Sequence, residues 1–259
     1  MPSENINVPE VFLNERIPYS QLFDIDEVAD KSTGLSHMMP SDDVFISFMK
    51  KMDIRKSDHI ICYDRAGVFS SPRAWFTFRI FGANNISILN GGFPKWKSEK
   101  LPIESGDKLR VQEIKRDPPS QGDFDYKKDS SKILDAHEIL LQSSRQKEGR
   151  IDEHIIDCRA PPRYRGEVDE PRPTIRKGHV DTASNVFFKD LLDSQGCYKN
   201  PEELKKEFEK QNINIQKPLT LYCGSGLTAC VDILALALLG RFDNCKLYDG
   251  SWAQMVFLI

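Results

Sequence analysis

Short apolar runs that end in turn signals alternate along the chain with longer runs that have helical spacing. The apolar runs predict strands at 59–64, 85–92, 154–159, 219–224 and 245–250. The helical runs predict helices at 71–82, 201–211 and 228–240. Strands that alternate with helices favour an α/β fold with a largely parallel sheet.

The strand-loop-helix-strand pattern occurs twice, which predicts two similar domains. The first copy begins at "HIICYDRAGVF" and the second at "LTLYCGSGLTA". The same 26 positions separate Asp64 from Asn90 and Cys223 from Asp249, so Asp64 occupies the place of Cys223. A cysteine in only one of two similar loops is expected where a duplicated fold keeps one working site.

The repeat and the segment between its copies give the expected domain boundaries. We expect residues 1–104 to form a non-catalytic N-terminal domain, 105–131 a linker and 132–259 a catalytic C-terminal domain. The linker is indicated by a charged sequence that contains proline and glycine. We also expect the first domain to lack its opening strands, and a closing helix to be missing where the chain stops after Trp252.

Composition narrows the classes of function. The chain has 259 residues, of which 39% are hydrophobic and 29% charged, with a formal net charge of -3. This balance is typical of globular proteins and lacks the basic excess of proteins that bind nucleic acids or membrane surfaces. No run approaches the ~20 apolar residues that span a bilayer. We therefore expect no nucleic-acid and no membrane partner.

The six cysteines are scattered along the chain, without a CxxC pair or the Cys/His spacing of a metal site. They predict free thiols in a reducing compartment and no metal. For most of them the expected role is that of a small buried hydrophobic side chain.

Cys223 differs, because it stands between a predicted strand and a predicted helix in "LYCGSGLTACVDIL". Gly224 and Gly226 allow the backbone to curl so that N–H groups converge on the sulfur, and the helix adds its positive end. Ser225 and Thr228 add hydroxyl donors, with Thr228 suited to the N-cap position. Such a loop stabilises a thiolate, and equally a persulfide on the same sulfur.

Three other loop chemistries fail on spacing. A tyrosine-phosphatase loop needs an arginine where Ala229 stands, and a GxSxG nucleophile elbow needs glycine at position 223. A nucleotide-binding P-loop needs a Gly-Lys-Ser/Thr run, which the sequence lacks. A structural cysteine before a glycine-rich turn remains the alternative interpretation.

The segments "CGSGLTA", "NGGFPKW", "DCRAPPRYRGEVDEPR" and "YDGSW" together resemble the tandem-rhodanese family of 3-mercaptopyruvate sulfurtransferases. The resemblance extends over nearly the whole chain from about Glu15. It implies two rhodanese-like domains, each a mostly parallel sheet flanked by helices, with only the C-terminal domain catalytic.

The resemblance also implies roles for individual residues. Arg163 and Arg172 match the two arginines that hold the carboxylate and keto oxygen of the donor, a task that suits the forked guanidinium. In so charged a stretch, surface ion pairs are the alternative for either one.

Asp26 and His37 match a pair proposed to relay a proton together with the loop serine, here Ser225. For His37 the alternative is a polar residue that caps a loop. Gly224, Gly226 and Thr228 are expected to line the donor site.

The implied reaction transfers sulfur from 3-mercaptopyruvate to Cys223 as a persulfide, releases pyruvate, and then passes the sulfur to thioredoxin or another thiol acceptor. It requires no metal or organic cofactor. We expect a cytoplasmic or mitochondrial protein that is a monomer or weak dimer.

Two alternatives stay open. The first is thiosulfate as the donor, which the uncharged Gly-Ser-Gly loop disfavours because rhodaneses proper carry cationic residues there. The second is a non-catalytic rhodanese-like binding module.

Overall fold

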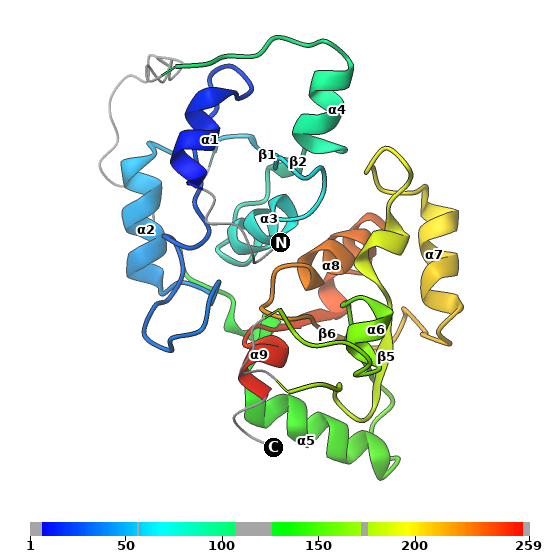
Figure 1. Ribbon diagram of the computed structural model, residues 1–259. Coiled ribbons are helices and arrows are strands. Elements are labelled where there is room, and N and C mark those ends of the chain that lie inside the picture. Colours follow the sequence, from blue (N-terminus) through cyan, green and yellow to red (C-terminus); the bar gives the residue numbers. More distant parts are fainter. Residues whose placement is uncertain (1–6, 56, 107–125, 172–175, 256–259) are drawn as a thin grey trace.

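The structure is a computed structural model that describes residues 7–55, 57–106, 126–171 and 176–255. It contains two α/β units side by side (Figure 1). The elements of the first unit are α1 (Val8–Asn14), α2 (Asp42–Lys51), β1 (Ile60–Cys62), α3 (Ser71–Ile80), β2 (Ile86–Ile88) and α4 (Gly92–Ser98).

The second unit follows in chain order. Its strands are β3 (Ile133–Leu134), β4 (His154–Asp157), β5 (Ala183–Asn185), β6 (Leu219–Tyr222) and β7 (Cys245–Tyr248). Its α-helices are α5 (Ala136–Lys147), α6 (Pro161–Tyr164), α7 (Pro201–Glu209), α8 (Ala229–Leu238) and α9 (Ser251–Met255). Its 3-10 turns are η1 (Ser130–Lys132), η2 (Phe188–Leu191) and η3 (Phe242–Asn244).

The five strands of the second unit pair in the order β3-β7-β6-β4-β5, and every pairing is parallel. All four residues of the central strand β6 are buried, because α7 and α8 cover one face of the sheet and α5 and α9 the other. The carboxyl ends of parallel strands meet at one edge of a sheet. The loops that follow β4, β6 and β7 therefore lie together.

The first unit has a smaller sheet among its described residues, the parallel pair of β1 and β2. Ile61 in the middle of β1 is 58% exposed, so one face of this pair is not covered.

The predicted internal repeat is confirmed in three dimensions. β1 pairs with β2 through Ile60 and Ile86, and β6 pairs with β7 through Leu219 and Cys245, in the same register. The hydrogen bond after each loop is repeated as well. The N–H of Phe93 donates to the carbonyl of Asp64, and that of Trp252 donates to the carbonyl of Cys223, both at 3.0 Å.

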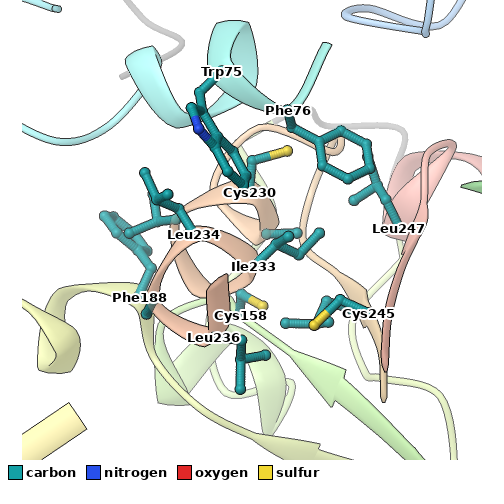
Figure 2. Close-up of a cluster of buried hydrophobic side chains, with 14 of the residues drawn as sticks. Trp75, Phe76, Cys158, Phe188, Cys230, Ile233, Leu234, Leu236, Cys245 and Leu247 are labelled. Atoms are coloured by element: carbon teal, nitrogen blue, oxygen red, sulfur yellow. The ribbon is translucent and has the colours of Figure 1, made fainter. Parts of the chain in front are cut away.

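The two units share one hydrophobic core, which crosses their boundary between α3 and α8. Figure 2 shows Trp75 and Phe76 of α3 against Cys230 and Leu234 of α8. Both helices are buried over most of their length. The interface therefore resembles a protein interior, which holds the first unit firmly against the loop before α8.

The expected fold class is confirmed: both units are α/β structures built on parallel strands with flanking helices. Each predicted strand and helix is present with shorter bounds, and the run 85–92 ends as a strand at Ile88 because α4 begins at Gly92. Most of the predicted linker, residues 107–125, lies outside the described residues. No helix in the described part of the chain is long and apolar enough to cross a membrane.

Candidate active site

Cys223 follows β6 directly and is 2% exposed. Its carbonyl and that of Gly224 are bound by the first turn of α9, through the N–H groups of Trp252 and Ala253 at 3.0 Å each. In a trans peptide the carbonyl and the N–H of one unit point in opposite directions. The N–H groups that follow these two carbonyls therefore point away from α9, into the loop.

The two glycines of the loop lie close to neighbouring residues, and at Gly226 a larger residue would not fit. A Cβ at Gly226 would lie 2.9 Å from the carbonyl oxygen of Asp249, and the φ of Gly226 is +73°, a left-handed value. A Cβ at Gly224 would lie 2.9 Å from Nη2 of Arg163. The loop is thus packed against the residues that follow β7 on one side and against an arginine on the other.

The corresponding loop of the first unit indicates which charge such a backbone binds. The Asp64 carboxylate accepts hydrogen bonds from the N–H groups of Ala66, Phe69, Ser70 and Ser71 at 2.8–3.0 Å. It also accepts the Ser71 hydroxyl at 2.8 Å. A loop of this shape therefore binds a negative group at the start of a helix, as expected from its N–H groups and the helix dipole.

The structure brings together the three residues of the predicted relay. Nδ1 of His37 lies 3.1 Å from Oγ of Ser225, and Nε2 of His37 lies 3.1 Å from Oδ1 of Asp26. The His37 side chain is 16% exposed, whereas that of Asp26 is 65% exposed. A hydroxyl, an imidazole and a carboxylate therefore form a continuous chain from the loop to the surface.

Arg163 lies on α6 and faces the loop at Gly224. Its Nε donates to Oε1 of Glu170 at 3.1 Å, and its Nη2 donates to Oε2 of the same carboxylate. Glu170 is buried and also accepts Nη1 of Arg159 at 2.8 Å. The Arg163 side chain keeps 27% of its surface exposed. The guanidinium is thus fixed in direction beside the cysteine loop.

The other sequence-predicted residues have different positions. Arg172 lies outside the described residues. Arg165 pairs with Glu167 at the surface. Thr228 stands at the N-cap of α8 as expected, but its backbone is helical and its side chain makes no capping hydrogen bond. The capping part of that prediction is wrong, because a hydroxyl cannot reach the N–H groups of the first turn from a helical backbone.

Two further thiols, those of Cys158 and Cys230, are buried near the loop. Burial raises the pKa of Cys230 to about 12. Burial, followed by the nearby carboxyl of Asp232, also raises the pKa of Cys158. Both stay protonated near neutral pH and are poor nucleophiles. All six cysteines of the chain are free.

Arg73 was not predicted from the sequence; it lies on α3 of the first unit and donates to the carbonyl of Gly226 at 3.3 Å. Asp249 was noted in the sequence only because it occupies the position of Asn90 in the second copy of the repeat, and no role was predicted for it. The described residues contain no group of three or more His, Cys, Asp or Glu side chains that could hold a metal ion.

Comparisons with known proteins show which proteins this chain is similar to. The family model of the rhodanese-like domain matches residues 6–99 and 140–256. The chain is 36% identical over 251 residues to the 3-mercaptopyruvate sulfurtransferase of Escherichia coli K12, which covers 97% of this chain and 84% of that protein. It is also 32% identical over 262 residues to the mitochondrial thiosulfate/3-mercaptopyruvate sulfurtransferase 1 of Arabidopsis thaliana. That match covers 98% of this chain and 69% of the Arabidopsis protein.

A solved structure is similar over nearly the same range. It is the crystal structure of SseA from Escherichia coli, which is described as a 3-mercaptopyruvate sulfotransferase with the rhodanese fold. Its TM-score to this chain is 0.81, at 34% sequence identity. The match covers 96% of this chain and 88% of that one.

Proposed function

The chain belongs to the rhodanese-like family of 3-mercaptopyruvate sulfurtransferases, and on this premise we propose that it moves sulfur from 3-mercaptopyruvate to a thiol acceptor through a persulfide on Cys223. That it is a sulfurtransferase follows from its family. The identity of the donor, the persulfide intermediate and the roles of individual residues are proposed in addition.

The observation that carries the proposal is the set of groups around the cysteine loop. Arg163 offers a fixed cation beside Gly224, and Ser225 connects through His37 to Asp26 on the opposite unit. A donor with a carboxylate at one end and a sulfur at the other matches a cation that lies beside an anion-stabilising loop.

In the first step the Cys223 thiolate attacks the donor sulfur. The new S–S bond forms as the C–S bond of 3-mercaptopyruvate breaks, and the electron pair of that bond leaves as the enolate of pyruvate. The enolate then takes a proton, for which the chain of Ser225, His37 and Asp26 is the proposed source. In the second step an acceptor thiolate takes the outer sulfur and restores Cys223.

The proposed binding roles follow from position. Arg163 and Arg172 together are proposed to hold the carboxylate and the keto oxygen of the donor, and the place of Arg163 beside Gly224 supports its part in this. Gly224, Gly226 and Thr228 line the loop face that receives the sulfur. Neutral loop residues suit a donor whose carboxylate is bound elsewhere, which supports 3-mercaptopyruvate over thiosulfate.

The organisation of the chain is part of the proposal. Residues 1–104 form the non-catalytic domain, 105–131 the linker and 132–259 the catalytic domain. The position of the larger sheet, all of whose strands follow residue 132, supports this division.

The six free cysteines and a mitochondrial relative support a cytoplasmic or mitochondrial location. Thioredoxin or a small thiol is the proposed acceptor, with the chain acting as a monomer or weak dimer.

The test is to supply 3-mercaptopyruvate or thiosulfate, with and without a dithiol, and to follow pyruvate, sulfide and the mass of the Cys223 peptide. We expect pyruvate from 3-mercaptopyruvate, a gain of one sulfur on the peptide without dithiol, and loss of both in Cys223→Ser. Turnover with thiosulfate alone would reassign the donor. A folded protein that forms no persulfide with either donor would be a binding module.

A further inference from the structure

Arg73 is a residue of the first unit whose guanidinium contacts the catalytic loop of the second. It lies on α3 and is 2% exposed. Its Nη1 donates to Oδ1 of Asp249 at 2.7 Å and to the carbonyl of Gly226 at 3.3 Å. Its Nη2 donates to the carbonyl of His37. One side chain thus touches both halves of the proposed site.

Asp249 completes this connection from the other side. It follows β7, is 3% exposed, and its Oδ2 accepts the N–H of Met39 at 2.6 Å. The ion pair of Arg73 and Asp249 therefore joins three segments: the Cys223 loop, the end of β7 and the chain around His37. Its hydrogen bonds are directional and shielded from water, so they fix orientation as well as distance.

The bond to Gly226 determines how the loop faces the sulfur. With the Gly226 carbonyl held by Arg73, and also by the Cys230 thiol at 3.3 Å, the N–H of Leu227 in the same peptide unit points the opposite way. Without that hold the unit can turn and direct a carbonyl toward the anion. In the first unit the loop directs the N–H groups of Ala66 and Phe69, the counterparts of Ser225 and Thr228, at Asp64.

The hydrogen bond from Arg73 to the His37 carbonyl holds the backbone of His37, the residue that contacts Ser225. His37 has a φ of +64°, a left-handed conformation that residues with a Cβ rarely adopt. Its imidazole contacts Ser225 only while the backbone keeps this conformation. The Arg73 donor to the His37 carbonyl and the Asp249 acceptor for the Met39 N–H hold the two sides of this turn.

We propose that Arg73 and Asp249 form a positioning pair through which the non-catalytic domain sets both the N–H groups around Cys223 and the imidazole of His37. The inference rests on the proposed roles of Cys223 and His37. It assigns the first domain a part in the chemistry beyond carrying Asp26 and His37.

The test compares Arg73→Met, Arg73→Lys, Asp249→Asn and the double variant Arg73→Met/Asp249→Asn. Arg16→Met is the matched control, because Arg16 is also a buried arginine that pairs with a carboxylate, that of Glu104 at 3.2 Å, and it also donates to the carbonyls of Leu13 and Gly106. Circular dichroism establishes which variants fold.

Two readouts are needed. The first is the pH dependence of iodoacetamide alkylation at Cys223, followed by the mass of its peptide, which requires no sulfur donor. The second is kcat and KM with 3-mercaptopyruvate. If the wild type turns over no 3-mercaptopyruvate, the proposed function fails while the alkylation profile still tests the positioning pair.

We expect the alkylation midpoint of Arg73→Met and Asp249→Asn to rise by about one pH unit or more. Their kcat should fall by at least about tenfold with a much smaller change in KM, because Arg163 is untouched. Arg73→Lys should recover part of the loss, and Arg16→Met should stay within about twofold of the wild type.

The double variant separates orientation from charge. If Arg73→Met acts only by leaving the Asp249 charge beside the thiolate, removing that charge restores the alkylation midpoint and overturns the proposal. A midpoint that stays raised supports it. A folded Arg73→Met with wild-type profile and kcat, or an equal shift in Arg16→Met, also overturns it, and Asp249→Asn carries the test if Arg73→Met does not fold.

Discussion

Asp232 on α8 is a fully buried carboxyl group whose two oxygens have no hydrogen-bond partner within the described part of the chain. Burial raises its pKa well above the ordinary value of 3.8, partly offset by a contact with the Cys158 thiol. The protonated form of the side chain is therefore favoured in the folded protein. Asp232 lies behind the Cys223 loop, where an ionised carboxylate would oppose a thiolate at Cys223.

Stability should therefore depend on pH through this residue. Above about pH 4 the unfolded chain releases the Asp232 proton while the folded chain keeps it. The free energy of unfolding then falls by about 1.4 kcal/mol per pH unit until the raised pKa is reached. Asp232→Asn should remove this component, so its unfolding free energy relative to wild type should increase from about pH 5 to pH 8.

Urea unfolding at several pH values measures this difference. The control is Asp243→Asn, which makes the same charge change at a side chain that is 100% exposed. A constant difference between Asp232→Asn and wild type across the range would mean that the carboxyl is already ionised in the folded protein.

Among individual residues, the sequence identified those candidate site residues that lie in recognisable motifs. Cys223, Ser225, His37 and Asp26 were found in this way, and the contacts of His37 with Ser225 and Asp26 follow from the fold. Glu170 was not among the expected site residues, and it is buried between Arg159 and Arg163. Burial of a charge is set by tertiary packing, which one sequence does not reveal.

Among the elements, α5 is the longest helix of the described chain and was not predicted. Its signal was present, because Asp135 and Glu138 form a capping box at its start. The helix buries only four of its residues, so its sequence is weakly apolar. The spacing of its hydrophobic residues therefore did not indicate a helix. The strongly apolar α8 and β6 were found because burial on all sides requires such a sequence.

The capping box should contribute measurably to the stability of α5. Asp135 accepts the N–H of Glu138 at 2.8 Å, and Glu138 accepts the N–H of Asp135 at the same distance. Asp135→Ala should lower the unfolding free energy by about 1 kcal/mol, whereas Asp135→Ser keeps an acceptor and should lose much less. Urea unfolding of both variants at one pH measures this, and equal losses would show that the cap is not responsible.

On the scale of the whole molecule, the shared core between α3 and α8 makes the two units one cooperative structure. Trp75 of α3 is buried and packs edge-on against Phe242 of the second unit, with ring centroids 5.4 Å apart. Neither unit keeps its apolar face covered if the other unfolds. The sequence predicted two similar domains but could not predict this contact, which depends on how two surfaces far apart in the chain fit together.

The cooperativity is testable by unfolding the whole chain in urea. Tryptophan fluorescence reports both units through Trp75, Trp96 and Trp252, and far-ultraviolet circular dichroism reports all helices. We expect the two signals to change at the same denaturant concentration. Two separated transitions would show that the units unfold independently and that the α3–α8 contact is weak.

The carboxylate of Asp64 in its own loop has a consequence for how such a pair of domains can diverge. Buried N–H groups that point inward and have no acceptor would destabilise either domain. With the Asp64 side chain in that place, the first copy has no thiol in its loop, and its backbone still holds α3 and Arg73 in place. On the proposed function, natural selection preserves the same loop for two reasons, for reactivity in one domain and for rigidity in the other.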